Sequence, residues 1–245
     1  MRNIRIKKRK ITTLIMVIGN GLLGREFKKY NDFNNCIIFA SGVSNSNETD
    51  NVEFEREKLL LIKTIKENKD MKIIYFSSVL AGITNNKYYG HKIELEELIK
   101  KETNNHLIFR IPQVVGNNGN KNNLFNYLIT SIINNSRIII YDKIDRAIID
   151  VDDVVKIVGY CNNKTTGETL FLSAIEKIKV MDLYIKITSF LNKEQNAIKG
   201  YTPEGKWLNE NWLKDNSVIV NEAINALDIS PNGYTDKIIN KYIKH

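Results

Sequence analysis

Residues 13–24 read TLIMVIGNGLLG, an apolar run that ends at Ile18 and passes directly into a glycine motif. The run has the length of a buried strand, and the following residues predict a helix from Arg25 to about Phe33. A G-x-G-x-x-G motif between a strand and a helix offers backbone N–H groups and a helix N-terminus to a pyrophosphate. The alternative interpretation is a glycine-rich turn that packs the helix on the strand. We expect a dinucleotide-binding loop made of Gly19, Gly21, Leu22, Leu23 and Gly24.

Short apolar strands alternate with amphipathic helices along most of the chain. Examples are the runs Cys36–Ala40, Met71–Phe76 and Leu107–Ile111, with helical spacing in Glu53–Asn68 and Tyr88–Glu102 between them. This alternation predicts an α/β fold with a doubly wound parallel sheet, covered by helices on both faces. No linker rich in proline, glycine or serine divides the chain, so residues 13–245 are expected to form one unit.

The acidic residue that usually follows such a glycine motif is missing. An Asp or Glu about 20 residues on normally holds the ribose hydroxyls of the dinucleotide. The corresponding segment, Phe39–Ser46, contains no acid, and Asp32 precedes the second strand. Either the cofactor is selected differently, or the adenosine half of the pocket is reduced.

A second group of polar residues predicts proton transfer. Ser77 and Ser78 end the third strand, and Tyr88 and Lys92 lie four residues apart on one face of a helix. A nearby cation lowers the pKa of a tyrosine, which is about 10 when unperturbed. A serine hydroxyl beside it can bond a carbonyl oxygen. Such a set suits proton transfer during hydride exchange at a carbonyl or an alcohol.

Composition excludes several classes of protein. The 245 residues are 42% hydrophobic and 26% charged, which excludes a wholly disordered chain, and no apolar run reaches transmembrane length. Two distant cysteines, Cys36 and Cys161, exclude a disulfide scaffold and a cysteine zinc site, so a reducing, cytoplasmic compartment fits. No cluster of metal ligands is evident, and His91, His106 and the acids of Glu94–Glu97 are interpreted as surface residues.

The net charge of +8 is concentrated at one end of the chain. Six of the 36 basic residues lie in residues 1–10, which leaves 30 basic against 28 acidic residues elsewhere. Residues 1–12 therefore predict a disordered basic leader. A nucleic-acid protein would spread its charge over a face, so no specific nucleic-acid partner is expected.

In their order along the chain, the motifs resemble the extended branch of the short-chain dehydrogenase/reductase superfamily, the nucleotide-sugar epimerases, dehydratases and 4-ketoreductases. The resemblance covers about residues 13–200. Its residues are the glycine motif, Phe76-Ser-Ser78, Tyr88-x-x-x-Lys92 with Glu96, Arg110-x-Pro112, Val115-Gly116, Arg146-Ala-Ile-Ile-Asp-Val-Asp-Asp153 and Gly167-Glu-Thr-Leu-Phe-Leu.

The resemblance implies roles for matching residues. Tyr88 would be the acid–base residue, Lys92 would bind the nicotinamide ribose and lower the pKa of Tyr88, and Ser78 would orient the substrate carbonyl. Arg146 would bind the diphosphate of a nucleotide sugar, although an ion pair with Asp150 or Asp142 is equally open. Ala40 and Ser41 would line the cofactor. Segments of about 112–136 and 175–245 would cap the substrate, and a homodimer is possible.

Three departures from the family pattern affect the expected function. Only one short helix fits between Gly24 and Cys36, where the family has two further strands, so we infer that those strands are missing. Arg25 could contact a 2′-phosphate and favour NADP over NAD. Val79-Leu80 stands where dehydratases carry an Asp-Glu pair, which argues against dehydration.

The resulting hypothesis is an NAD(P)-dependent oxidoreductase or epimerase acting on a nucleotide sugar, a 4-keto or deoxy sugar for glycan biosynthesis. The alternative is a catalytically reduced family member that binds a nucleotide or a nucleotide sugar.

Overall fold

The computed structural model describes residues 15–30, 33, 35–83, 86–119, 123–141, 145–200 and 213–243. Its centre is a parallel five-stranded sheet in the order β1-β2-β3-β4-β9. The strands are β1 (Ile15–Ile18), β2 (Cys36–Phe39), β3 (Lys72–Ser78), β4 (His106–Ile111) and β9 (Glu168–Phe171). This confirms the predicted α/β class and parallel sheet.

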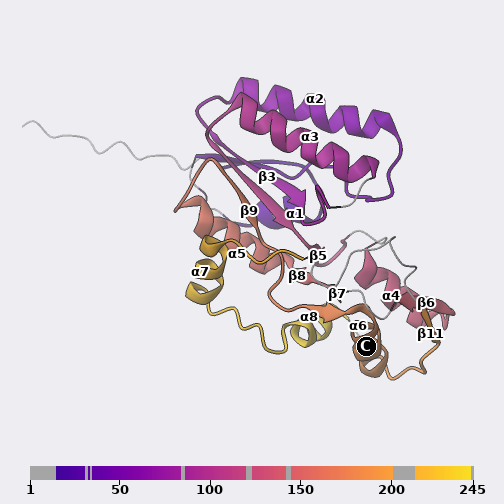
Figure 1. Ribbon diagram of the computed structural model, residues 1–245. Coiled ribbons are helices and arrows are strands. Elements are labelled where there is room, and N and C mark those ends of the chain that lie inside the picture. Colours follow the sequence, from indigo (N-terminus) through magenta and orange to yellow (C-terminus); the bar gives the residue numbers. More distant parts are fainter. Residues whose placement is uncertain are drawn as a thin grey trace, which may run out of the picture.

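The two faces of the sheet are covered by different pairs of helices (Figure 1). Helices α2 (Asn51–Glu67) and α3 (Lys87–Glu102) pack on one face, against Ile37, Ile73 and other residues of that cluster. Helices α1 (Leu22–Phe27) and α5 (Val151–Asn162) pack on the opposite face, against Ile38, Ile74 and their neighbours. Because successive strand residues point to opposite faces, strands with two buried faces must be apolar throughout, as β2 is.

The chain leaves the first two strands in opposite directions. The glycine loop after β1 leads to α1 on one face, and the loop after β2 leads to α2 on the other. Adjacent loops that diverge in this way open a crevice at the carboxyl ends of their strands. The crevice therefore lies between the glycine loop and residues 40–50.

Strand β1 forms the edge of the sheet within the described part of the chain. It pairs only with β2 there, which agrees with the inferred loss of two strands that the family places beyond it. All four of its residues are half-buried, whereas all four of β2 are buried. Within the described sheet, the first strand is therefore the shallow one.

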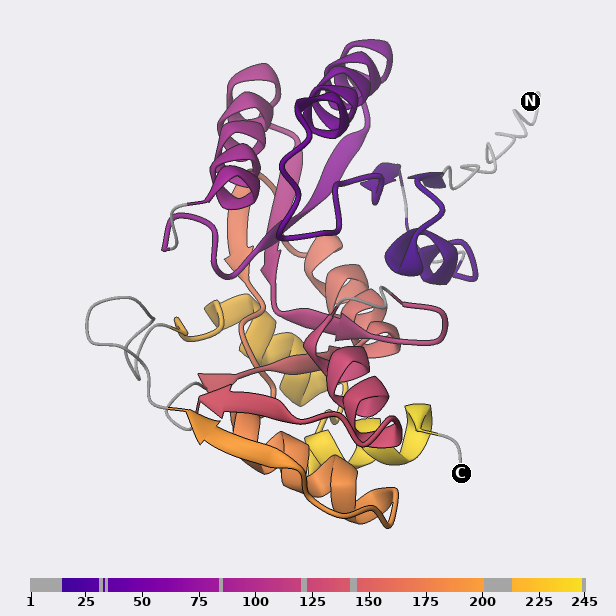
Figure 2. The ribbon, with the colours of Figure 1, turned by 90° about the vertical axis from the view of Figure 1, so that its right-hand side faces the viewer.

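A second lobe lies below the carboxyl ends of the sheet (Figure 2). It contains three two-stranded ladders: β5 (Gln113–Val115) with β8 (Ile148–Asp150), β6 (Ile138–Tyr141) with β11 (Ala197–Gly200), and β7 (Asp145–Arg146) with β10 (Ile178–Lys179). Its helices are α4 (Leu124–Ile133), α6 (Val180–Phe190), α7 (Val218–Ala226) and α8 (Tyr234–Tyr242). One apolar cluster runs from α1 through α5 to α8, so both lobes share a core.

Some sequence expectations need correction. The first helix is Leu22–Phe27, because it begins inside the glycine motif and Gly21 is its N-cap residue. The basic leader and the residues Asp32 and Asp142 lie outside the described part of the chain. Of the described helices, none is long and apolar enough to span a bilayer.

Candidate functional site

A cavity of about 640 Å³ opens at the carboxyl ends of β1, β2 and β3. Its size is in the range of small-molecule sites. Ten of the residues singled out from the sequence line it: Gly21, Leu22, Leu23, Arg25, Ala40, Ser41, Ser78, Tyr88, Lys92 and Arg146. The fold thus brings the glycine loop and the Ser–Tyr–Lys set to one cavity, from segments up to 125 residues apart.

The three glycines of the motif differ in what surrounds them. Gly19 has φ +119°, and a Cβ there would lie 2.2 Å from the carbonyl oxygen of Ala40. A Cβ on Gly24 would lie 2.4 Å from the carbonyl oxygen of Gly19. Gly21 has no such neighbour within 4 Å and borders the cavity. The outer glycines therefore permit close backbone packing, and the middle one leaves space beside the loop for a ligand.

Arg25 links the glycine loop to the second lobe. Its guanidinium donates to the carbonyl oxygen of Asn20 at 2.9 Å and to that of Asn118 at 2.8 Å. The side chain is exposed and lines the cavity. Its charge remains at the mouth of the cavity, because both of its partners are neutral carbonyl groups.

The two serines of β3 differ in their partners. Ser77 is buried and donates to Oε1 of Glu96 at 2.5 Å. Ser78 is half-buried, and its Oγ accepts from the backbone N–H of Leu80 at 3.2 Å. That contact leaves the Ser78 proton to be donated, so Ser78 is the serine suited to a ligand in the cavity.

Lys92 is buried on α3 and anchored to two groups. Its Nζ donates to Oε1 of Glu57 at 2.9 Å and to Oη of Tyr75 at 3.1 Å. Tyr75 in turn donates to the same Glu57 oxygen at 2.9 Å. The carboxylate raises the pKa of Lys92 against the effect of burial, so the amine stays charged.

Tyr88 lies beside this ammonium, with Lys92 Nζ 5.6 Å from its ring centre. Burial raises the pKa of Tyr88, Lys92 lowers it, and Glu57 raises it, with a net increase. The expected effect of Lys92 is therefore present, but burial outweighs it. The phenol is protonated at neutral pH in this state.

Arg146 lines the cavity together with Tyr89, with which it interacts electrostatically. Its guanidinium donates to the backbone carbonyl of Asp145 at 3.0 Å. Burial lowers the pKa of the guanidinium. Asp150 pairs with Lys241 of α8 at 2.6 Å. The cation is thus partly desolvated at the cavity wall.

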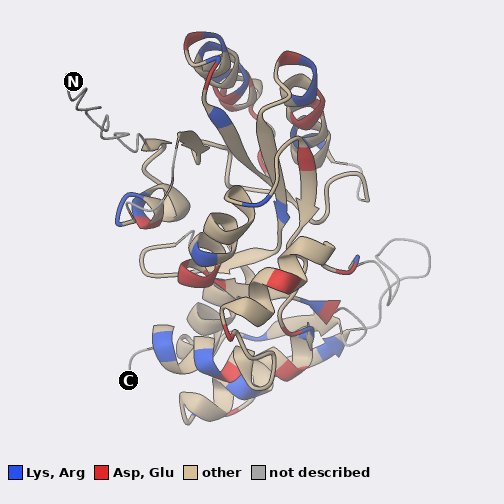
Figure 3. Cartoon of the chain, turned by 90° about the vertical axis from the view of Figure 1, so that its left-hand side faces the viewer, with Lys and Arg blue, Asp and Glu red and all other residues tan. Residues whose placement is uncertain are grey.

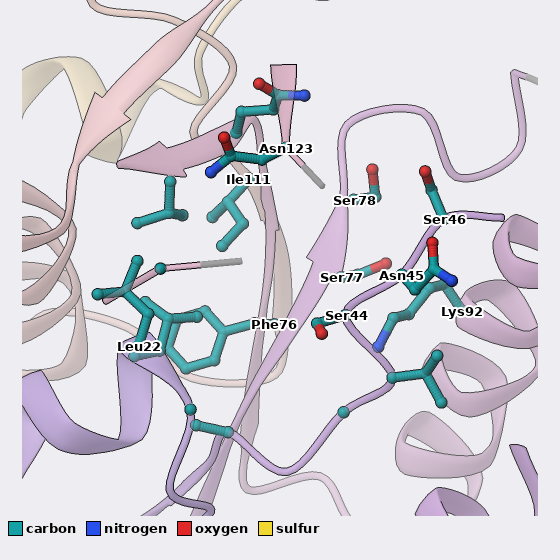
Figure 4. A pocket seen from close by; sticks show the side chains of 18 of the residues that line it. Leu22, Ser44, Asn45, Ser46, Phe76, Ser77, Ser78, Lys92, Ile111 and Asn123 are labelled. Carbon is teal, nitrogen blue, oxygen red and sulfur yellow. The ribbon is translucent and has the colours of Figure 1, made fainter. Parts of the chain in front are cut away.

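The two sides of the cavity differ in polarity (Figure 4). Leu22, Phe76 and Ile111 lie on one side, which carries Asn123 at its edge, whereas Ser44, Asn45, Ser46 and Lys92 lie opposite them. Such a cavity suits a ligand with one apolar and one hydroxyl-rich surface.

Comparison with known proteins defines the fold. No protein-family model and no curated protein sequence matches the chain. Among solved structures, it is similar to dTDP-4-dehydrorhamnose reductase from Bacillus anthracis in complex with NADP, at 15% identity and a TM-score of 0.68 over 93% of this chain and 98% of that chain. It is also similar to dTDP-glucose 4,6-dehydratase from the same organism in complex with NAD, at 13% identity and a TM-score of 0.65 over 90% of this chain and 76% of that one.

A third similar structure is UDP-N-acetylglucosamine 4-epimerase from Methanobrevibacter ruminantium, in complex with UDP-N-acetylmuramic acid. The identity is 16% and the TM-score 0.62, over 90% of this chain and 78% of that chain. The chain therefore shares the fold of these three structures, with a parallel Rossmann-type sheet.

Within this fold, the wall of the cavity contains an unsatisfied polar atom. Gln113 follows Pro112 on β5 and lines the cavity, and among the described residues its buried Oε1 has no hydrogen-bond partner. Buried polar atoms are normally bonded, so this atom fits a wall that binds a polar ligand.

The sequence motifs did not reveal that two carboxylates are buried beside the cavity. Glu57 and Glu96 are each 0% exposed, and Glu96 bonds Arg110 through both oxygens, at 2.9 and 2.7 Å. The surface interpretation was therefore wrong for Glu96, and also for His91 and His106, which are buried. For Glu57 a signal existed, because it interrupts the apolar helical stripe of Phe54, Leu61 and Ile65.

Proposed function

We propose that the protein is an NAD(P)-dependent oxidoreductase or epimerase that acts on a nucleotide sugar, with a 4-keto or deoxy sugar of glycan biosynthesis as substrate. The observation that carries the proposal is the convergence of Ser78, Tyr88 and Lys92 on one cavity with the open Gly21 loop. A protein that only binds a ligand has no need of a proton donor, a charged amine and a hydroxyl together.

The residues present fit a dinucleotide. The loop at Gly21 admits a pyrophosphate against the main chain, and Arg25 supplies a cation at the same end. Ala40 and Ser41 follow β2 at the crevice, and Lys92 retains a donor for a ribose hydroxyl. When bound, the nicotinamide would supply or take the hydride, which no side chain here can do.

The chain's own residues would handle the sugar and the proton. Ser78 would donate a hydrogen bond to the carbonyl oxygen of the sugar. Tyr88 would donate its phenolic proton to that oxygen during reduction, and would take it back during oxidation. Arg146, which lines the cavity, would bind the diphosphate of the nucleotide sugar.

Binding of each cofactor tests the proposal directly. Calorimetric titration with NADH and NADPH, separately, should show micromolar affinity for one of them, and NADPH would agree with Arg25 as a contact to the 2′-phosphate. Purified Tyr88→Phe should bind the same cofactor and lose turnover of 4-keto-sugar nucleotides by about a hundredfold or more.

A second candidate is a catalytically reduced protein that binds a nucleotide sugar. The raised pKa of Tyr88 and the shallow strand β1 favour it. Affinity for nucleotide sugars without any affinity for NADH or NADPH would establish this candidate and reject the oxidoreductase.

A further inference from the structure

The buried carboxylate of Glu57 lies at the centre of a hydrogen-bond network that spans three elements. Its Oε1 accepts from Lys92 and Tyr75, each at 2.9 Å. Its Oε2 accepts from the backbone N–H of Val43 at 2.8 Å and contacts Nε2 of His91 at 3.3 Å. A charged carboxylate that is buried on the apolar face of a helix requires hydrogen-bond and ion-pair partners of this kind. They hold the pKa of Glu57 well below its usual range, despite its burial.

The network leaves Lys92 one donor for a ligand. An ammonium has three N–H groups. Within the described chain, Glu57 and Tyr75 take two of them, and the lysine also lines the cavity. Gly42 covers the pair closely, because a Cβ at this position would lie 2.8 Å from Lys92 Nζ and 2.9 Å from Glu57 Oε1. The amine therefore has little freedom to move.

The same carboxylate limits the charge that Tyr88 experiences. Burial raises the pKa of Tyr88, Lys92 lowers it, and Glu57, which is bonded to Lys92, raises it further. The other ionisable groups around the network are two phenols, one histidine and two ion-paired carboxylates. They are Tyr75 on β3, His91 on α3, Tyr89 beside Arg146, Glu94 paired with Lys58, and Glu96 paired with Arg110.

We infer that Glu57 is a positioning residue, which fixes the Lys92 ammonium through Oε1 and leaves one of its N–H groups for the ligand. The inference rests on the proposed function for its ligand, whereas the pairing itself can be tested without one. It assigns to α2 a part in chemistry that the sequence placed entirely on β3 and α3.

The first test measures stability against pH, in the absence of ligand. In the wild type, a raised Lys92 pKa gives stability that is present below pH 10.5 and lost above it. In Glu57→Gln, burial without a charged partner lowers the pKa of Lys92 in the folded protein. The unfolded chain then binds one proton more than the folded chain, so the stability of this variant rises with pH. Urea midpoints should therefore show that Glu57→Gln is less stable than the wild type at pH 7, and that this difference in stability shrinks from pH 7 to pH 10.

Two control variants separate charge from shape. Glu57→Asp keeps the charge and should show a deficit that does not change with pH. Glu57→Gln/Lys92→Met removes both charges and should be more stable than Glu57→Gln at pH 7, again without pH dependence. The pairing is overturned if the stability lost in Glu57→Gln is the same from pH 7 to pH 10. It is also overturned if the double variant is no more stable than Glu57→Gln at pH 7.

The second test repeats the titration with NADPH and NADH at pH 7 and pH 9. Wild-type affinity for the bound cofactor should change little, and that of Glu57→Gln should fall about tenfold as Lys92 loses its proton. Parallel profiles for the two proteins overturn the positioning role and leave the oxidoreductase proposal intact. If neither protein binds a dinucleotide while the stability curves differ as expected, the pairing stands and the oxidoreductase proposal is rejected.

Discussion

The two ends of the cavity are built very differently. At the β3–α3 end, the carboxylates of Glu57 and Glu96 are fully buried, and each is bonded by a cation and a hydroxyl group. At the β1 end, the strand is half-buried, Arg25 is exposed and Gly21 faces open space. In the proposed enzyme, the precise geometry needed for proton transfer is retained, whereas the dinucleotide is held by a shallower surface.

The largest expected effect is at the β3–α3 end. Replacing Arg110 by Met leaves Glu96 buried with Ser77 as its remaining partner and should destabilise the protein by about 3–5 kcal/mol. Urea unfolding measures the loss. The double variant Arg110→Met/Glu96→Gln should recover most of it, and a double variant as unstable as the single one would show that packing of the arginine, not charge, is responsible.

A matched pair of isoleucines compares the two ends directly. Ile38 on β2 is 0% exposed, whereas Ile18 on β1 is half-buried. Ile38→Ala should lower the free energy of unfolding by about 2–5 kcal/mol, and Ile18→Ala by about 1–2 kcal/mol. Equal losses would contradict the view that β1 is the shallow side.

The glycines provide a test at the β1 end itself. Gly24→Ala should cost about 1–3 kcal/mol, because its Cβ would collide with the carbonyl of Gly19. Gly21→Ala meets no atom and should leave the urea midpoint unchanged, while weakening dinucleotide affinity in calorimetry. Unchanged affinity in Gly21→Ala would remove this loop from the proposed cofactor site.

The smallest effect concerns a thiol on the strand next to β1. Burial raises the pKa of Cys36 to about 11, from 9.0. A raised folded-state pKa gives stability that is present below pH 9 and lost as pH rises towards 11. Between pH 8 and pH 10 the wild type should lose about 1 kcal/mol more than Cys36→Ala. Identical pH profiles would mean that water reaches β2 despite its burial.

Much of the site followed from the sequence because its signals are local. The glycine motif and Tyr88-x-x-x-Lys92 are short patterns, and their order along the chain predicted the fold. Glu57 could not be assigned in the same way, since its partner Lys92 is 35 residues away and on another helix. Likewise, β6 and β11 are each short, and their pairing joins Ile138 to Ala197 across distant segments.

The charge patterns of α2 and α3 also explain why Glu96 was predicted to lie on the surface. Lysine, arginine and acidic residues are mixed along both helices (Figure 3), so the buried acids are not distinguished by composition. Only their position on the helix separates them, as with Glu96 facing Arg110 and Glu97 facing solvent beside Lys100.

The placement of α1 has a consequence for the handedness of the chain. The steps from β1 to β2 and from β2 to β3 move in the same direction across parallel strands, yet α1 and α2 lie on opposite faces. Two crossovers that move in the same direction but pass over opposite faces have opposite handedness. Helix α3 lies on the same face as α2, so the connection through α1 differs in handedness from the other two. Nearly all crossovers of this kind are right-handed. The connection through α1 is therefore the exception, and it is this connection that places the glycine loop and residues 40–50 on either side of one crevice.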